Sequence, residues 1–147
     1  MSTDTHVMKD LIETLEDGKD GFAKGAEKLA ADGSPDVAAT FRELSAQRGR
    51  FSEELRSLGT FGDDVDESGS LAAAVHRGWM SLKDALSGSD PKGVLDVAEQ
   101  GEDHAVKKFE KALTEDLSPG LRTVVERQLR DVQAAHDRVR DLRNAHA

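Results

Sequence analysis

The fold of this chain is decided by the stretch VLDVAEQGEDHAVKKFEKAL, residues 94–113. Its apolar residues recur at alternating intervals of three and four, which places them on one face of a helix that packs against other helices. One position of this seam is Glu102, a carboxylate where the core of a helical bundle normally holds an apolar side chain. The apolar members of the seam are Leu95, Ala98, Ala105, Phe109 and Ala112.

A second seam contains the opposite charge. In residues 41–58 the same spacing recurs, and the position that lacks an apolar residue is Arg48. Arg48 lies fifteen residues after the expected turn at Gly33, and Glu102 lies fifteen residues before the expected turn at Leu117. Because opposite charges at one level of a low-dielectric core attract strongly, we predict that Arg48 pairs with a carboxylate. Glu102 is the first choice, followed by Glu16 and Asp17. The apolar members of this seam are Phe41, Leu44, Phe51, Leu55 and Leu58.

The composition excludes several classes of function. The formal charge of −9, from 29 acidic and 20 basic residues, argues against nucleic acid as a partner, because phosphate contacts need an excess of Lys and Arg. The same charge argues against an anionic membrane surface. The absence of cysteine excludes disulfides and thiol chemistry. Residues 1–10 lack the features of a signal peptide and no apolar run could span a membrane, so we expect a cytoplasmic protein.

Three prolines mark helix starts. Pro35, Pro91 and Pro119 each follow a Ser or Asp that can cap a helix, with the proline at the first helical position. Gly33 and Gly59 are natural stops for the helices before them. The spacing of apolar residues and these signals predict helices over about 5–31, 35–58, 70–86, 91–115 and 119–144.

The order of these helices predicts the architecture. Short connections make the first two and the last two long helices antiparallel hairpins. We therefore expect one all-α domain over residues 1–147, a ferritin-like four-helix bundle of two antiparallel hairpins joined by a long crossover that carries a short extra helix. Trp79 is the expected anchor of the crossover on the bundle, and His76 lies beside it.

The middle of such a bundle is where ferritin-like proteins bind two metal ions. That site needs a Glu from each of two helices and a Glu-x-x-His motif from each of the other two. No Glu-x-x-His motif occurs in the sequence. Glu16, Glu102 and His136 are the remaining metal-ligand candidates, whereas Arg48, Glu102 and Gln128 are predicted to form a structural polar core. We therefore expect no cofactor, with iron or manganese as the alternative.

Enzymatic signatures are missing as well. A hydrolase needs a nucleophile beside a base, but the serines cluster at helix caps and in loops. The glycines at 18, 21 and 25 recur within a helix, so they do not form a phosphate-binding loop. The sequence thus favours a non-enzymatic protein.

The chain also resembles a known family. The resemblance is carried by LAAAVHRGWM at residues 71–80, Gly101-Glu102-Asp103, ERQL at 126–129 and AHDRV at 135–139. It extends over nearly the whole chain, and the His-Arg-Gly-Trp crossover is its most specific part. These segments resemble a bacterial four-helix-bundle family, a domain of unknown function in the ferritin-like superfamily. The resemblance implies a ferritin-like fold and a link to stress physiology, and it brings no catalytic residues with it.

These observations leave three functional hypotheses. The first is a soluble, non-enzymatic bundle with a structural, interaction or stress-related role. The second is a metal-binding ferritin-like protein of the di-iron or di-manganese type, with oxidase or metal-handling activity. The third is a helical adaptor with an exposed apolar groove for a partner. The sequence leaves the oligomeric state open, with a homo-oligomer suggested by analogy with the fold alone, and it identifies no protein partner.

Overall fold

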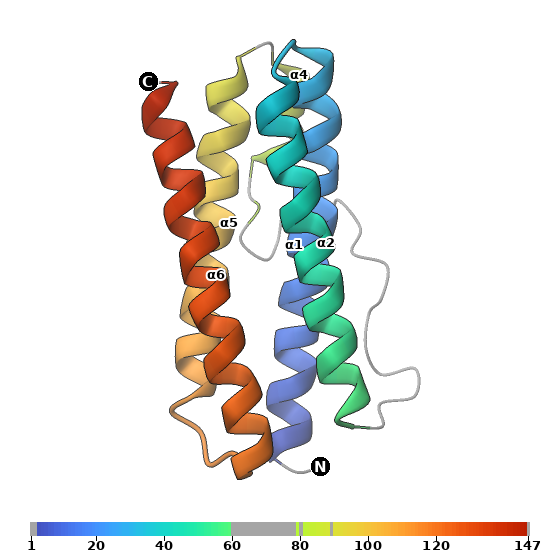
Figure 1. Ribbon diagram of the computed structural model, residues 1–147, viewed down its shortest axis with the longest axis vertical. Coiled ribbons are helices and arrows are strands. Elements are labelled where there is room, and N and C mark those ends of the chain that lie inside the picture. The colour runs from blue at the N-terminus through green and yellow to red at the C-terminus, as the bar shows by residue number, and fades with distance from the viewer. Residues whose placement is uncertain (1–2, 60–78, 80, 89, 147) are drawn as a thin grey trace.

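The computed structural model describes residues 3–59, 79, 81–88 and 90–146. All regular secondary structure in these residues is helical, which confirms the prediction of an all-α protein. The helices keep the labels of Figure 1. They are α1 (Thr3–Ala31), α2 (Pro35–Ser57), α4 (Leu82–Ser87), α5 (Pro91–Ala112) and α6 (Pro119–Ala145).

The long helices run along the long axis of the molecule (Figure 1). α1 and α6 run upward in this view and α2 and α5 run downward, with α4 near the top. α1 packs most closely against α2, and α5 packs against α6. The two pairs meet chiefly where α1 contacts α5, while α2 and α6 touch at few positions. The chain turns between α1 and α2 at Gly33, whose positive φ of 85° suits a residue without a side chain.

The prolines stand where the sequence placed them. Each of α2, α5 and α6 begins with a proline in its first turn. Only one of the three expected caps uses its side chain, since Asp90 accepts a hydrogen bond of 3.0 Å from the backbone N–H of Lys92. Ser34 and Ser118 make no such bond. Proline geometry, rather than capping, is therefore the feature that these three starts share.

The end of α5 and the last residue of the α2 seam differ from the prediction. α5 ends at Ala112 rather than near Glu115, because the backbone N–H groups of Thr114 and Glu115 donate to carbonyls three residues back, at Lys111 and Ala112, instead of four. The carbonyls of Leu113 and Glu115 accept hydrogen bonds of 3.0 and 2.8 Å from the guanidinium of Arg122, which replaces further helix. α2 ends at Ser57, next to the predicted end at about Leu58, but Leu58 itself, the last member of the predicted seam, is 46% exposed instead of buried.

The predicted crossover helix over 70–86 is wrong at its centre. Trp79 is not helical and Ser81 has a φ of 72°, a left-handed conformation that a continuous right-handed helix cannot contain. Among the described residues of this region, helix begins at Leu82, the first residue of α4. Residues 70–78, including His76, lie outside the described residues, so the prediction that His76 flanks the anchor stays a prediction.

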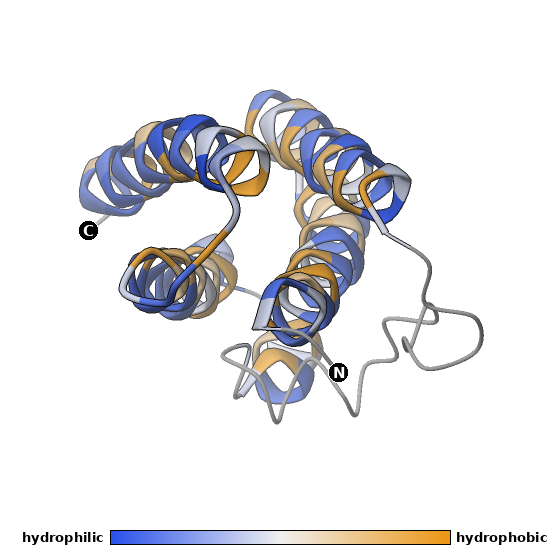
Figure 2. Ribbon diagram, turned by 90° about the horizontal axis from the view of Figure 1, so that it is seen from below, coloured by the Kyte–Doolittle hydropathy of each residue, from blue (hydrophilic) through white to orange (hydrophobic). Residues whose placement is uncertain are grey.

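The apolar core consists of two clusters. Figure 2 shows the hydrophobic stripes of the helices turned toward the space between them and hydrophilic residues turned outward. We call the cluster near the α1–α2 turn the upper cluster, and the one near the α5–α6 turn the lower cluster. The upper cluster includes Phe22, Leu29, Phe41, Trp79, Leu82, Leu95, Ala98 and Val139. The lower cluster includes Met8, Leu11, Leu15, Phe51, Leu55, Ala105, Phe109, Val125 and Val132.

No helix in the described part of the chain combines the length and the apolar character needed to cross a membrane.

Candidate functional site

Charged and polar side chains separate the two apolar clusters. Along α1, α2 and α5 the lower and upper clusters are each interrupted at one level, and buried polar residues occupy the interruption. We call this set the polar layer. Its members are each at most 4% exposed, and they are Glu16, Asp17, Arg48, Ser52 and Glu102.

Arg48 and Glu102 form a two-pronged ion pair in the polar layer. The Nη1 atom of Arg48 donates to Oε1 of Glu102 at 2.5 Å, and Nη2 donates to Oε2 at 2.7 Å. Both side chains are 1% exposed. The pair joins α2 to α5, so it links one hairpin to the other through the core. Charge-assisted bonds in this parallel geometry are among the strongest that side chains make.

The remaining surroundings of Arg48 also suit a buried guanidinium. Its Nε donates to Oε1 of Gln47 at 3.2 Å. Its Cζ lies 5.4 Å from the ring centre of Phe22, within the range of a cation–π contact. Each nitrogen of the guanidinium therefore has a hydrogen-bond acceptor, and the ring of Phe22 lies near its Cζ. These contacts offset part of the free energy lost when the group is removed from water.

Glu16 belongs to the same layer but has different partners. Its Oε1 accepts a hydrogen bond of 2.8 Å from Oγ of Ser52 and lies 3.5 Å from Nη2 of Arg56. Its Oε2 lies 2.8 Å from Nζ of Lys19, one turn further along α1. Glu16 is thus paired through α2 and its own helix, while Arg48 contacts Glu102.

Gln128 enters the core from α6. It is fully buried, and its Nε2 donates to the backbone oxygen of Phe51 at 3.2 Å and to Oε1 of Glu54 at 2.9 Å. Glu54 also pairs with Arg127, whose hydrogen bond lowers the pKa of the Glu54 carboxyl. Gln128 therefore bridges α6 and α2 at the edge of the lower cluster, where the two helices make few other contacts.

His136 lies away from the polar layer, on the outer seam between α5 and α6. Its Nε2 is 2.5 Å from Oδ1 of Asp103, and its Nδ1 is 3.1 Å from Oδ1 of Asp137. Partial burial lowers the pKa of His136, but the hydrogen bonds to Asp137 and Asp103 and their charges outweigh it and raise the pKa overall. Two carboxylate neighbours favour the doubly protonated imidazolium, which has no lone pair for a metal ion.

His104 shows the opposite behaviour. It follows Asp103 in α5, and burial lowers its pKa, with a further contribution from the charge of Lys108. Its Nε2 is buried without a hydrogen-bond partner. Burial and a positive neighbour both favour the neutral imidazole. Two histidines at this level of α5 therefore prefer opposite protonation states. His136, which contacts Asp103, favours the imidazolium, and His104 favours the neutral ring.

The three metal-ligand candidates do not come together. Glu102 has both oxygens bound to Arg48, Glu16 is bound by Ser52 and Lys19, and His136 is on the outer seam. Among the residues that the structure describes, no group of three or more His, Asp or Glu side chains is arranged to bind a metal ion. A di-metal centre of the ferritin-like type also needs carboxylates free to bridge cations, whereas a guanidinium holds the central one. The residues that the structure describes at this level therefore do not fit such a centre.

Several contributors were not identified from the sequence. Ser52 donates a hydrogen bond to Glu16 and Lys19 forms an ion pair with it, and the spacing of four between Arg48 and Ser52 could have indicated a shared helix face. Gly21 and Gly101 lie against the ring of Trp79, which is 2% exposed. This contact could not be predicted from their positions in the sequence, because the two glycines are eighty residues apart.

The fold and the site together define a class: an all-helical protein with a charged, hydrogen-bonded layer in its core. The family follows from a comparison with family models, in which Domain of unknown function (DUF2383) matches residues 4–115. The match spans most of the chain, and the protein belongs to this family. It includes the whole polar layer and Trp79, and it ends before α6. A search of curated proteins finds no match.

Proposed function

We propose that this protein is a ferritin-like four-helix bundle that acts without a di-metal centre, as a soluble, non-enzymatic structural or interaction protein. The observation that carries the proposal is the ion pair between Arg48 and Glu102, both 1% exposed. In a di-metal bundle this level holds cations between carboxylates. Here the positive charge is an arginine side chain of the protein itself.

Electrostatics supports this assignment. A carboxylate buried in a core needs a cation or several hydrogen-bond donors, since burial of an unpaired charge is very costly. The guanidinium supplies both the charge and two donors in fixed geometry, and it cannot be deprotonated in a protein. A metal ion that entered beside Glu102 would have to displace a permanent charge that is covalently tied to α2.

The burial of the polar layer, which a substrate could not reach, supports the proposal that the protein is not an enzyme. Catalysis requires that a substrate reach the reacting groups, and the polar layer is at most 4% exposed. His136, the histidine among the metal-ligand candidates, has both ring nitrogens bound to carboxylates, which removes its capacity as a general base. A cytoplasmic location, self-association and a role in stress physiology complete the proposal, and they rest on composition, fold analogy and the resemblance described above.

Elemental analysis tests the proposal. The full chain is purified without added metal, then incubated with excess Fe²⁺ or Mn²⁺ and desalted, and the metal content per chain is measured before and after. We expect both values to stay far below one equivalent, and the melting temperature to be unchanged by a chelator. Near-stoichiometric iron or manganese in the wild-type protein would overturn the proposal in favour of the metal-binding alternative.

A matched variant makes the same test sharper. Arg48→Met removes the internal cation and leaves Glu102 in place, with Glu16 and Asp17 at the same level. If only this variant gains metal, the arginine excludes metal from the layer, as proposed. Equal metal content in both proteins, at or near one equivalent, would show that Arg48 has no such role.

A further inference from the structure

Trp79 occupies a narrow site between α1 and α5. We call this site the ring slot and define it by Gly21 of α1, Gly101 of α5 and Phe22, which all contact the indole or lie beside it. We propose that the ring slot is a binding site for a planar aromatic ring of the indole class, and that Trp79 is its tethered occupant.

The two glycines make the walls of the slot. A Cβ atom added at Gly21 would lie 2.5 Å from Cδ2 of Trp79, and one added at Gly101 would lie 2.5 Å from both Cε2 and Nε1. Real Cβ atoms essentially never come closer than 3.0 Å to another heavy atom. The backbones of two helices therefore approach one indole from α1 and from α5. Neither position can carry a side chain while the ring is in place.

Aromatic chemistry selects the occupant further. The ring of Phe22 meets Trp79 edge-on, with centroids 5.0 Å apart and an angle of 78° between the planes. Phe22 meets Phe41 in the same way at 5.1 Å and 88°. Edge-to-face contacts pair the positive rim of one ring with the negative face of another, so a saturated ring of similar size gains nothing from them. The close approach of Gly21 and Gly101 thus favours a planar occupant, and the edge-to-face contact with Phe22 favours an aromatic one.

Trp79, the occupant of the ring slot, belongs to neither α1 nor α5. Trp79 is in the crossover, and the backbone reverses its local hand at Ser81, two residues later, before α4 begins. The slot therefore joins three separate parts of the chain through one side chain. A tethered ring acts at an effective concentration set by its linker, typically in the millimolar range, so a free indole must compete with Trp79 in the wild-type protein. Removal of the Trp79 ring should leave an apolar site, and sites of this kind stay dry and bind small aromatic molecules.

The decisive experiment supplies free indole to a Trp79→Ala variant of the full chain. We expect saturable binding by calorimetry and a melting temperature that rises with indole concentration, with no response to cyclohexanol. The matched control is the double variant Trp79→Ala/Gly101→Ala, in which the new methyl group fills the slot and indole should not bind. A folded Trp79→Ala protein that ignores indole, or that responds equally to cyclohexanol, would overturn the proposal.

A second measurement uses the wild-type ring and covers the case in which Trp79→Ala does not fold. Trp79 is the single tryptophan and the chain has no tyrosine, so its fluorescence reports the slot directly. Gly21→Ala and Gly101→Ala should each shift the emission toward that of hydrated indole. Gly93→Ala is the control, because a Cβ at this helical glycine meets nothing within 4 Å. Unchanged emission in both slot variants would refute the ring slot.

Discussion

Two arginine–carboxylate pairs with the same chemistry lie in different surroundings. Arg48 and Glu102 meet in the core with both side chains 1% exposed, whereas Arg138 and Glu43 meet on the surface at 3.2 Å with side chains 53% and 66% exposed. Both pairs join α2 to a helix of the other hairpin. The difference between them isolates what burial does to an ion pair.

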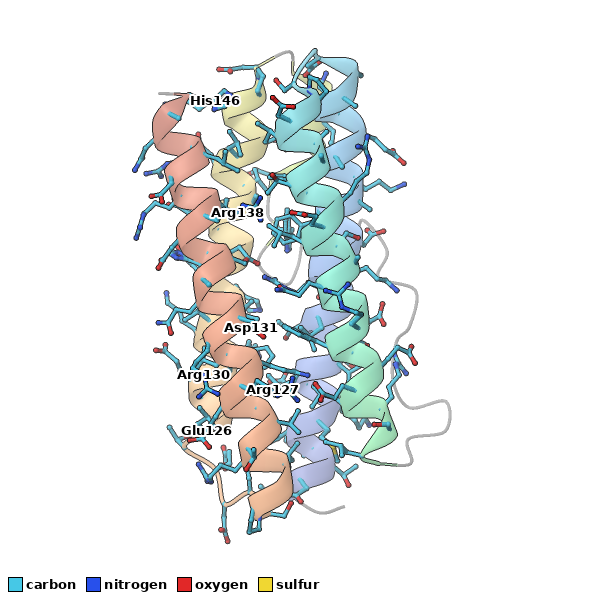
Figure 3. All side chains as sticks on the ribbon, viewed as in Figure 1. Glu126, Arg127, Arg130, Asp131, Arg138 and His146 are labelled. Carbon is cyan, nitrogen blue, oxygen red and sulfur yellow. The ribbon has the colours of Figure 1, made fainter. Side chains whose placement is uncertain are left out.

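Water decides the energetic outcome. On the surface each charge is hydrated with or without its partner, and salt screens the attraction. Figure 3 shows the charged residues Glu126, Arg130 and Asp131 along α6, and all three are exposed. In the core neither group has water to replace its partner. We therefore expect the loss of one partner of the interior pair to lower the folding stability strongly, and the loss of one partner of the surface pair to change it little.

The largest expected effect comes from breaking the interior pair. Arg48→Met strands a carboxylate and Glu102→Gln strands a guanidinium, so each change should lower the free energy of unfolding by about 3–5 kcal/mol. The double variant should recover much of that loss, because neither charge is then left alone. Denaturant unfolding of all four proteins gives the coupling energy.

Simple additivity of the two changes would contradict this prediction, since it would mean that the two groups do not depend on each other. Unfolding slopes must also be equal among the variants for the comparison to hold.

A smaller effect is expected from Ser52→Ala in the same layer. This change removes the 2.8 Å hydrogen bond to Oε1 of Glu16 and leaves that oxygen with the more distant Arg56. A buried acceptor that loses its donor costs about 1–3 kcal/mol. The matched control is Ser57→Ala, where an exposed hydroxyl donates to the carbonyl of Glu54. Chemical denaturation should show a larger loss in the free energy of unfolding for Ser52→Ala than for Ser57→Ala. Equal losses would contradict the prediction that the buried hydrogen bond of Ser52 stabilises the fold.

Breaking the surface pair should cost little. A double-mutant cycle on Arg138→Ala and Glu43→Ala should give a coupling energy of about 0–1 kcal/mol, and molar salt should abolish it. The measurement is the same denaturant series as for the interior pair, at low and high ionic strength. A salt-insensitive coupling as large as that of Arg48 and Glu102 would mean that burial is not what separates the pairs.

The smallest effect concerns the partly exposed contact of His136 with Asp103 and Asp137. Because its pKa is raised in the folded protein, the contact stabilises fully below the unfolded value of 6.5 and loses this contribution as the pH rises through the folded pKa. The stability difference between wild type and His136→Asn should therefore be greater at pH 5.5 than at pH 8.5. Thermal melts at both values test this, and a difference that grew toward alkaline pH would contradict it.

Local patterns allowed much of the architecture to be predicted. Proline positions gave the starts of α2, α5 and α6, since the ring of proline is compatible with the first turn alone. The three–four spacing placed Arg48 and Glu102 on the inner faces of their helices. Their equal distances from the turns put them at one level, and the two side chains meet there. The same reasoning failed where periodicity stops, as at Leu58 and at the end of α5.

The sequence by itself thus determined the four long helices, their inner faces and the identity of the charges in the core, because these depend on residues within a few turns of each other. Only the tertiary structure decided that Ser52 binds Glu16, and that Trp79 leaves the helical path to lie between Gly21 and Gly101. Those contacts depend on how closely two backbones approach and on where a neighbouring segment turns. Distance between helices is set by the packing of all side chains together, and no local spacing encodes it.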